Sequence, residues 1–325
     1  MPFFFEEFPR TTGSSAGMTM MIDRLLPGID EFLEFGWRYL TVAKIGWGLP
    51  LLMDSTLLSR RIRKYRDRGV EVSNGGTLLE LASSRNLLVP ALRHLSEAGF
   101  SAVEMSEGII DLPRNEKNEI VEFARKKAMK LYIEIGRKNA GNQLSLEETL
   151  DHINMALEFE PDMVIIEGRE TGKSVEIYDS EGNIKWDWVA RIAETFDMSR
   201  IMFEAPREDQ QAQLVTRLGP SVNLGNVSMQ SVLPLQSQRM GYRGDTFGGH
   251  VSPDKISGSP AAKFVYHIIA SHLSVDQSQI SRISGLNRRT VQIALESLTT
   301  QGVVKAMSDP RDMRHRIYSA DRVRN

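Results

Sequence analysis

The sequence predicts a (β/α)8 barrel followed by a small winged helix-turn-helix domain. Three observations lead to this prediction. Short apolar segments alternate with amphipathic stretches along most of the chain, several of these segments end in an acidic residue, and the last part of the chain differs from the rest in charge. A (β/α)8 barrel places its functional groups at the carboxyl ends of its strands, and the acidic residues fall there.

Eight apolar segments are candidate strands, separated by amphipathic stretches such as Ser55–Arg68 and Asn115–Lys127. Eight units of this kind match the usual barrel size. An open doubly wound sheet is the main alternative, but no Gly-x-Gly-x-x-Gly follows the first segment and no P-loop is present. The candidate strands are Gly17–Asp23, Leu40–Ile45, Val70–Ser73, Ala102–Ser106, Lys130–Ile135, Met163–Glu167, Ile201–Glu204 and Ser221–Val227.

Acidic residues stand at or next to the end of four of these segments. Asp23, Glu134, Glu167 and Glu204 each close an apolar run and precede a loop, and Arg169 follows Glu167 closely. The carboxyl ends of barrel strands form one rim, so we expect the four carboxylates to form a ring there.

A Gly/Ser/Pro-rich stretch divides the chain into two domains. From His250 onward the chain carries eleven Lys and Arg against six Asp and Glu, a net charge of +5, whereas the preceding residues carry 29 against 36, a net charge of −7. We predict a barrel domain over residues 1–249, a linker over 250–259 and a second domain over 260–325.

Composition excludes several classes of protein. There are no cysteines, so disulfides, thiolate nucleophiles and cysteine-bound metals are excluded. The six histidines lack the spacing of a zinc site. No uncharged span reaches the roughly 20 residues that cross a membrane, and the amino-terminal segment lacks the basic region of an export signal. We expect a soluble, cytoplasmic protein without a membrane partner, and a homo-oligomer.

Nine short motifs follow one another along residues 17–248. They are Lys44–Gly48, Gly75–Glu80, Gly99–Gly108, Glu134–Lys138, Ile166–Gly172, Phe203–Pro206, Gln210–Gln211, Val222–Asn226 and Arg243–Phe247. In this order they resemble the phosphosulfolactate synthase family. The chain departs from the family pattern at Arg24-Leu25, where Lys-Gly is usual, and at Arg137-Lys138, where two lysines are usual.

The resemblance implies a magnesium-dependent addition of sulfite to phosphoenolpyruvate, giving (2R)-phospho-3-sulfolactate, the first step of one route to coenzyme M. Sulfite attacks the methylene carbon, so negative charge builds up on the substrate carboxylate, where a divalent cation can absorb it. Mg²⁺ prefers oxygen ligands. The predicted ligands are Glu134, Glu167 and Glu204, with Asp23 as a further candidate.

Cationic side chains are expected around such anionic reactants. Lys44, Lys138, Arg169 and Arg243 are candidate contacts, since arginine suits bidentate contacts to phosphate or carboxylate. The resemblance points to Lys138 as the general acid that protonates C2, a role that neighbouring cations would favour by lowering its pKa. Lys44 is the second predicted catalytic residue. Asp245 contacts the substrate or orients Arg243.

Two further assignments concern the barrel rim. Asn223, Gly225 and Asn226 are predicted to bind the phosphate, because barrels often bind phosphate after strands seven and eight. Glu80 and Glu104 either take part in the chemistry or brace a loop.

The second domain has the order of elements of a winged helix. It contains predicted helices at Ala261–His272 and Asp276–Ile283, a helix capped by Asn287, and strands at Val303–Met307 and Arg316–Ser319. This stretch resembles the winged helices of MarR-type regulators. Such a domain binds duplex DNA or, alternatively, mediates dimerisation or docks another protein. The predicted DNA contacts are Arg288, Arg289, Thr290, Gln292, Arg311, Arg314 and Arg316.

The alternative to an enzyme is a transcriptional regulator or stress protein. Its barrel would sense a phosphorylated or sulfonated metabolite, because a shared fold does not by itself establish a shared reaction.

Overall fold

The computed structural model describes residues 17–139, 141, 143–246, 259–270, 275–309 and 312–320. The chain divides into two compact units, Met1–Gln211 with Val222–Gln236, and Ala212–Ser221 with Ser237–Asn325. The predicted linker at 250–259 lies outside the described residues except for Ser259, so the domain boundary stays a prediction.

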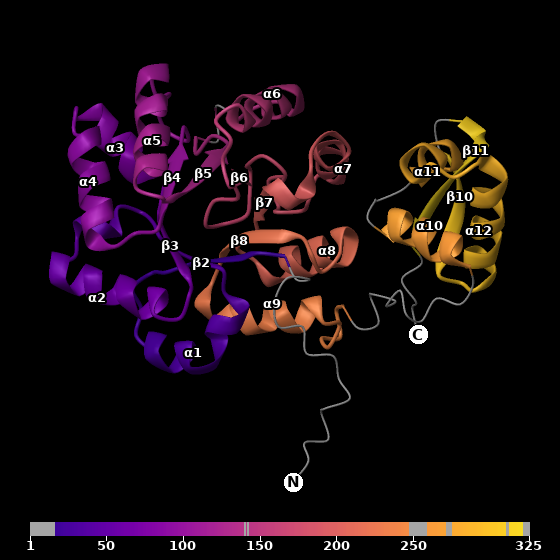
Figure 1. Ribbon diagram of the computed structural model, residues 1–325, viewed down its shortest axis with the longest axis horizontal. Helices are drawn as coiled ribbons and strands as arrows, with labels where there is room; N and C mark the ends of the chain where they lie inside the picture. Colours follow the sequence, from indigo (N-terminus) through magenta and orange to yellow (C-terminus); the bar gives the residue numbers. More distant parts are fainter. Residues whose placement is uncertain are drawn as a thin grey trace, which may run out of the picture. The chain divides into compact units, whose positions relative to one another are not determined.

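Eight parallel strands close into a barrel in the order of the sequence (Figure 1), and β8 pairs with β1. Every strand overlaps one of the predicted segments, which confirms the (β/α)8 barrel. The strands are β1 Thr19–Ile22, β2 Val42–Ile45, β3 Glu71–Asn74, β4 Ala102–Ser106, β5 Lys130–Ile135, β6 Met163–Ile166, β7 Ile201–Glu204 and β8 Asn223–Val227.

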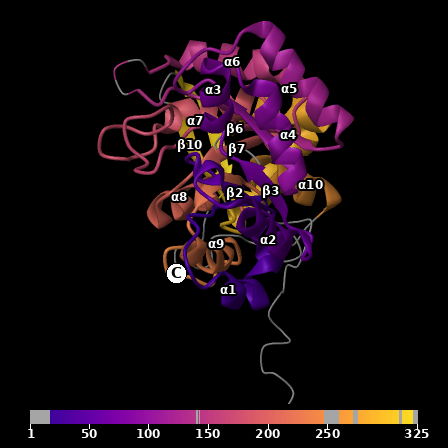
Figure 2. The same cartoon turned by 90° about the vertical axis from the view of Figure 1, so that its left-hand side faces the viewer.

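Helices connect the strands and lie outside them, as Figures 1 and 2 show for the α1 to α7 part of the barrel. In α2 the Asp54 side chain caps the helix by accepting from the backbone N–H groups of Thr56 and Leu57. The helices are α1 Ile29–Phe35, α2 Ser55–Arg66, α3 Thr77–Ser84, α4 Leu88–Ala98, α5 Arg114–Lys126, α6 Leu146–Leu157, α7 Trp186–Thr195, α8 Glu208–Leu218 and α9 Val232–Arg239. Short 3₁₀ turns occur at η1 Gly36–Tyr39, η2 Leu49–Leu51, η4 Met198–Arg200 and η5 Met229–Ser231.

One buried cluster of the barrel is an apolar layer contributed by alternate strand positions. It consists of Met20, Val42, Ala102, Tyr132, Met163, Ile165 and Met202. Side chains two residues apart on a strand point to the same side. Two residues after the apolar layer, the same face of these strands carries charged side chains, which are Lys44, Glu104, Glu134 and Glu204. A charged layer therefore lies above an apolar one, toward the carboxyl ends.

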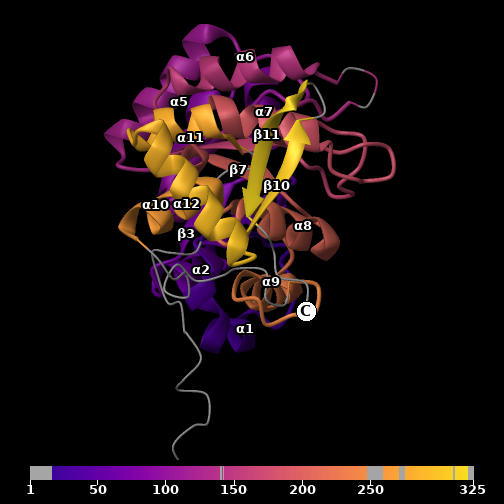
Figure 3. The ribbon, with the colours of Figure 1, turned by 90° about the vertical axis from the view of Figure 1, so that its right-hand side faces the viewer.

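The described residues of the carboxy-terminal segment form three helices and a three-stranded sheet of order β10-β11-β9. Figure 3 shows α10, α11 and α12 beside the strands β10 and β11. β10 and β11 form an antiparallel hairpin, and β9 pairs with β11. Apolar residues from all three helices form a separate core with Val275, Val303 and Val304. The elements are α10 Pro260–Ala270, β9 Val275–Asp276, α11 Gln277–Ser284, α12 Arg288–Thr300, β10 Val304–Asp309 and β11 Asp312–Ala320.

The predicted helices and the two hairpin strands of this segment are present, and Asn287 caps α12 by accepting from the N–H of Thr290. The sequence did not predict β9, which has only two residues. No helix in the described part of the chain has the length and apolar character to cross a bilayer.

Candidate active site

Lys44 is enclosed by three glutamates at the carboxyl end of the barrel. Its Nζ lies 2.8 Å from Glu104 Oε1, 2.8 Å from Glu134 Oε2 and 2.9 Å from Glu204 Oε1. Burial lowers the pKa of Lys44, but these carboxylates outweigh burial and hold it well above its usual value. Lys44 is therefore a charged partner of the glutamates and remains protonated.

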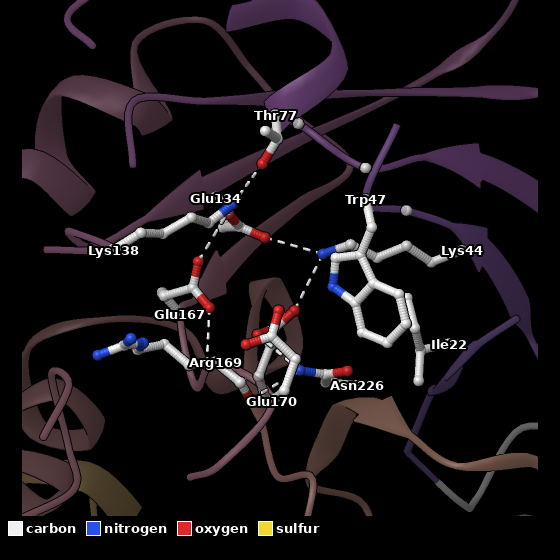
Figure 4. Close-up of a pocket in the computed structure, with 14 residues that line it drawn as sticks. Ile22, Lys44, Trp47, Thr77, Glu134, Lys138, Glu167, Arg169, Glu170 and Asn226 are labelled. Carbon is white, nitrogen blue, oxygen red and sulfur yellow. Dashed lines mark hydrogen bonds and ion pairs between the residues drawn. The ribbon is translucent and has the colours of Figure 1, made fainter. Parts of the chain in front are cut away.

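Lys138 stands on the other side of Glu134, in the loop after β5 (Figure 4). Its Nζ lies 3.0 Å from Glu134 Oε1 and 3.4 Å from Glu167 Oε2, and it donates to Thr77 Oγ1 at 2.9 Å. Burial lowers its pKa, yet the two carboxylates raise the pKa above the usual lysine value. The expected lowering by neighbouring cations is wrong for these surroundings, because the groups closest to Lys138 are anionic.

Three glutamates from successive strands converge on one point. Glu134, Glu167 and Glu204 are buried, and each contributes an oxygen to a group whose atoms all lie within 4.8 Å of one another. Glu134 Oε1 and Glu167 Oε2 receive no hydrogen bond, although both lie within ion-pair distance of Lys138. Unfilled carboxylate oxygens at this spacing can hold a divalent cation with oxygen preference.

Charge is unbalanced within this layer. Burial, which outweighs the effect of Lys44, raises the pKa of Glu104 to about 7. Burial, with the neighbouring Glu134 and Glu204, raises the pKa of Glu167 well above its usual range. Burial acts on Glu134 too, but Lys138 and Lys44 outweigh it and hold its pKa well below the usual value. Two lysines therefore do not neutralise four buried glutamates, and added positive charge would stabilise the ionised set.

Glu134, Glu167 and Glu204 line a pocket (Figure 4). Trp47 is 42% exposed at this pocket, and the Arg24 guanidinium lies 4.8 Å from its ring centre. The pocket also includes residues of the loops after β2 and β3. These residues were not predicted to be functional, although they stand in the motifs at 44–48 and 75–80. The lining residues are Ile22, Lys44, Gly46, Trp47, Gly75, Gly76, Thr77, Glu134, Lys138, Glu167, Arg169, Glu170, Glu204 and Asn226.

Two glycines allow adjacent strand ends to approach closely. Gly136 has φ +134°, and a Cβ there would lie 2.5 Å from Glu167 Cβ. A Cβ on Gly168 would lie 2.6 Å from the Glu204 carbonyl oxygen. Any side chain at either position would push the carboxylates apart.

Arg169 has a left-handed backbone that two neighbours hold in place. Its φ is +55°, its N–H donates to Glu167 Oε1 at 2.7 Å, and its carbonyl accepts from Asn226 Nδ2 at 2.9 Å. Asn226 also approaches Glu204 Oε2, at 3.3 Å. Arg169 and Asn226, which were both predicted to bind the substrate, therefore lie together at the pocket.

Asp23 does not join the three glutamates, contrary to the prediction of a ring of four. Its carboxylate accepts from Arg61 Nε and Nη2, both at 2.8 Å, from the Tyr65 hydroxyl at 2.7 Å, and from the N–H of Leu25. Both oxygens are thus engaged by α2 and by the loop after β1, which makes Asp23 a brace for that loop.

Asn223 and Gly225 also differ from their predicted role as phosphate contacts. Asn223 begins β8, at the end of the strand opposite the pocket, and its amide bonds the carbonyls of Met198 and Ile201 and the N–H of Met18. Gly225 lies inside β8, where its carbonyl accepts from Ala205. Asn223 and Gly225 therefore hydrogen-bond β8 to neighbouring segments of the chain.

Arg243, Asp245 and Glu80 have structural partners. Arg243 pairs with Asp245 at 2.9 Å, in the second compact unit, which agrees with Asp245 orienting Arg243. Glu80 braces the loop after β4, because it accepts from the Ser106 hydroxyl and from the N–H groups of Ile109 and Ile110. Of the predicted DNA contacts, Arg311 and the side chain of Arg314 lie outside the described residues.

Comparison with known proteins gives a consistent set of relatives. A family model described as (2R)-phospho-3-sulfolactate synthase (ComA) matches residues 7–245. The chain is 34% identical to the phosphosulfolactate synthase of Methanocaldococcus jannaschii over 250 residues, which cover 76% of this chain and 97% of that one. It is 32% identical to the phosphosulfolactate synthase of Methanothermobacter thermautotrophicus, over 71% of this chain and 92% of the relative.

A bacterial relative and a solved structure extend this comparison. The phosphosulfolactate synthase of Bacillus subtilis is 30% identical, over 74% of this chain and 94% of its own. Among solved structures, the 3-dehydroquinate dehydratase of Enterococcus faecalis superposes with a TM-score of 0.49 at 10% identity, covering 71% of this chain and 96% of that one.

Proposed function

The chain belongs to the (2R)-phospho-3-sulfolactate synthase family and is an enzyme of that type, and we propose that it adds sulfite to phosphoenolpyruvate. The product would be (2R)-phospho-3-sulfolactate, the first intermediate of one route to coenzyme M. The observation that carries this proposal is the Lys138 ammonium, held against Glu134 and Glu167 in a pocket at the barrel's carboxyl end. Family membership favours this enzyme over a barrel that only senses a metabolite.

The reaction requires one new C–S bond and one new C–H bond. The sulfur lone pair of sulfite attacks the methylene carbon, and the electrons of the C=C bond move to C2 and the carboxylate. A proton then adds to C2, and the phosphate ester stays intact. A site for this chemistry needs a proton donor on one face of the substrate and positive charge near its carboxylate.

Lys138 is the proton donor in this proposal. Its surroundings keep it protonated before the reaction, and 27% of its side chain is exposed toward solvent. Thr77 and the two carboxylates fix the direction of the ammonium. Proton transfer from a positioned side chain contributes about 10²- to 10⁴-fold to the rate. Solvent would restore the proton after each turnover.

We assign a magnesium site to Glu134, Glu167 and Glu204. Support comes from the grouping of their oxygens within 4.8 Å and from the two oxygens that receive no hydrogen bond. When bound, Mg²⁺ would draw the negative charge that develops on the substrate carboxylate. Asp23 is left out of this set because Arg61 and Tyr65 engage it.

Arg169 is the proposed contact for an anionic group of the substrates. Arg169 lines the pocket and has no ion pair with an acidic side chain in the described part of the chain. Its guanidinium is therefore free to bind sulfite, phosphate or carboxylate through paired N–H groups. Asn226 lines the same pocket and holds the Arg169 backbone, because its amide N–H groups donate to the Arg169 carbonyl and to Glu204 Oε2.

An assay with the purified chain tests this function. The chain is incubated with phosphoenolpyruvate, sulfite and Mg²⁺, and ³¹P resonances follow the loss of phosphoenolpyruvate and the growth of a phosphate ester. Mass spectrometry identifies the product. We expect phosphosulfolactate only when all three components are present. Absence of product at micromolar enzyme over hours would contradict the proposal.

We also propose that residues 260–320 form a winged helix-turn-helix that contacts duplex DNA. Support comes from the order α10, β9, α11, α12, β10, β11 and from the hairpin beside the helices. Arg288 and Arg289 are exposed in the first turn of α12, and Gln292 is exposed one turn later. This is the end of a recognition helix that reads base edges in the major groove.

Binding of the full chain to labelled duplex DNA at several salt concentrations tests the second proposal. Arg288→Ala/Arg289→Ala should weaken binding and flatten its salt dependence, because two phosphate or base contacts are lost. Arg60→Ala/Arg63→Ala removes two exposed arginines from α2 and is the charge-matched control. Equal binding by both double variants would contradict the assignment.

A further inference from the structure

We propose that Lys44 is a built-in cation that occupies one of two adjoining cation positions, so that the glutamate cluster takes one divalent ion instead of two. The inference rests on the magnesium site proposed at Glu134, Glu167 and Glu204. It assigns to Lys44 the role of a positioning residue that sets the number of metal ions. The sequence placed Lys44 among the catalytic residues, and its surroundings point to this different task.

The surroundings of the Lys44 ammonium are those of a metal ion. Three carboxylate oxygens, one each from Glu104, Glu134 and Glu204, lie 2.8 to 2.9 Å from Nζ. An ammonium has three N–H donors, so these oxygens match its full capacity. Carboxylate oxygens are also the ligands that Mg²⁺ and Mn²⁺ prefer. Lys44 Nζ thus lies where a cation would be bound by three carboxylates, and the chain supplies that cation as a side chain.

Two glutamates belong to both positions. Glu134 directs Oε2 to Lys44, while its Oε1 receives no hydrogen bond and faces Lys138. Glu204 binds Lys44 through Oε1 and also contributes to the group of oxygens within 4.8 Å. Carboxylates shared between neighbouring cations are the arrangement of two-metal sites. The barrel therefore has the ligand set of a two-ion centre, with an ammonium in one place.

Glu104 supplies the remaining evidence. It is fully buried and belongs only to the Lys44 position. Its Oε1 also accepts from the N–H of Gly76, whereas its Oε2 has no hydrogen-bond partner. A buried carboxylate oxygen without a donor is costly, so a more highly charged cation beside Glu104 would stabilise its ionised form.

The charges agree with a single divalent ion beside Lys44. Glu104, Glu134, Glu167 and Glu204 carry four negative charges when ionised, and Lys44 and Lys138 carry two positive ones. One Mg²⁺ makes the cluster neutral. Without Lys44 the same cluster would be negative with one ion, so a second divalent cation would be drawn into the vacated position.

Metal stoichiometry in the absence of substrates tests the inference. Mn²⁺ is titrated into the full chain and followed by calorimetry and electron paramagnetic resonance. We expect one Mn²⁺ in the unmodified chain, and two in Lys44→Ala with the spectrum of a spin-coupled pair. Lys44→Gln fills the space without a charge and should bind one ion. Lys117→Ala, which removes a lysine paired with Glu107 outside the pocket, is the charge-matched control and should also bind one.

Ethylammonium provides an independent measurement. It replaces the missing end of the Lys44 side chain, so it should displace the second Mn²⁺ from Lys44→Ala and leave the first in place. A single Mn²⁺ in Lys44→Ala, or a second Mn²⁺ that ethylammonium does not displace, would overturn the inference. If Lys44→Ala does not fold without metal, recovery of its native circular dichroism by two equivalents of Mn²⁺ supports the inference, and failure to recover contradicts it.

The two proposals fail in different ways. If the magnesium site itself is wrong, the unmodified chain binds no Mn²⁺. If only the role of Lys44 is wrong, the unmodified chain and Lys44→Ala each bind one ion. Neither readout depends on turnover of phosphoenolpyruvate and sulfite.

Discussion

Lys138 Nζ lies 3.0 Å from Glu134 Oε1, and the two residues are four positions apart where β5 ends. The end of β5 and the loop that follows it therefore carry the first carboxylate partner and the proposed proton donor. Glu167, from the next strand, contributes the second carboxylate at 3.4 Å. The ammonium is thus held where two strands meet, and its position depends on the local turn as well as on strand pairing.

Replacing Lys138 should abolish turnover while leaving the fold intact. Lys138→Ala removes the proposed proton donor, so kcat should fall by about 10²- to 10⁴-fold. Lys138→Arg keeps the charge but cannot practically release a proton, and should be about as slow. Lys130→Ala, at the exposed beginning of the same strand, is the matched control. Activity of Lys138→Arg above about a tenth of the original would argue against proton donation.

Removing a proposed metal ligand should weaken metal binding. Glu167→Gln has nearly the same shape but lacks the charge, so its Kd for Mn²⁺ should rise by at least about tenfold. Excess chelator should stop turnover of the unmodified chain, and added Mg²⁺ should restore it. Glu158→Gln alters an exposed glutamate on the barrel surface and should change neither quantity. An unchanged Kd in Glu167→Gln would remove that residue from the site.

The free energy of unfolding of the metal-free chain should decrease as the pH rises from 4.5 to about 7, because of Glu104. Burial raises its pKa from 4.5 to about 7, so in this window the unfolded chain ionises Glu104 while the folded chain does not. Each pH unit of difference is worth about 1.4 kcal/mol, which gives about 3 kcal/mol across the window. Urea unfolding of the original chain and of Glu104→Gln measures this. Parallel pH profiles would contradict the assignment.

A methyl group at Gly136 should destabilise the chain and disturb metal binding together. In Gly136→Ala the alanine would have a positive φ, and its Cβ would lie 2.5 Å from Glu167 Cβ. Together the two effects should lower the free energy of unfolding by about 3 kcal/mol. Gly219 also has a positive φ, +97°, but open space around it, so Gly219→Ala should cost only the backbone term, about 1 to 2 kcal/mol. Denaturant midpoints and Mn²⁺ affinities of both variants check this. Equal losses would mean that crowding at Gly136 is unimportant.

The alternation of strands and helices and the acidic strand ends were predictable from sequence, because each depends on neighbouring residues. The partners of Asp23 were not, since Arg61 and Tyr65 come from a helix 38 and 42 residues later. The partners of Asn223 were not predictable either, because its amide bonds carbonyls of η4 and of the first residue of β7, more than 20 positions earlier in the chain. The strand β9 was not predicted because a segment of two residues is too short to show an alternation of apolar and polar residues.

Lys44 and Glu204 are separated by 160 positions in the chain, yet their side chains form one ion pair. The positive charge that balances the acidic strand ends thus belongs to the second strand, and one of its partners to the seventh. A folding intermediate that has not yet added β7 has neither this ion pair nor the complete set of three glutamates. Long-range pairing of this kind forms late and slowly. The charged layer is therefore complete only when β7 has joined the strands before it.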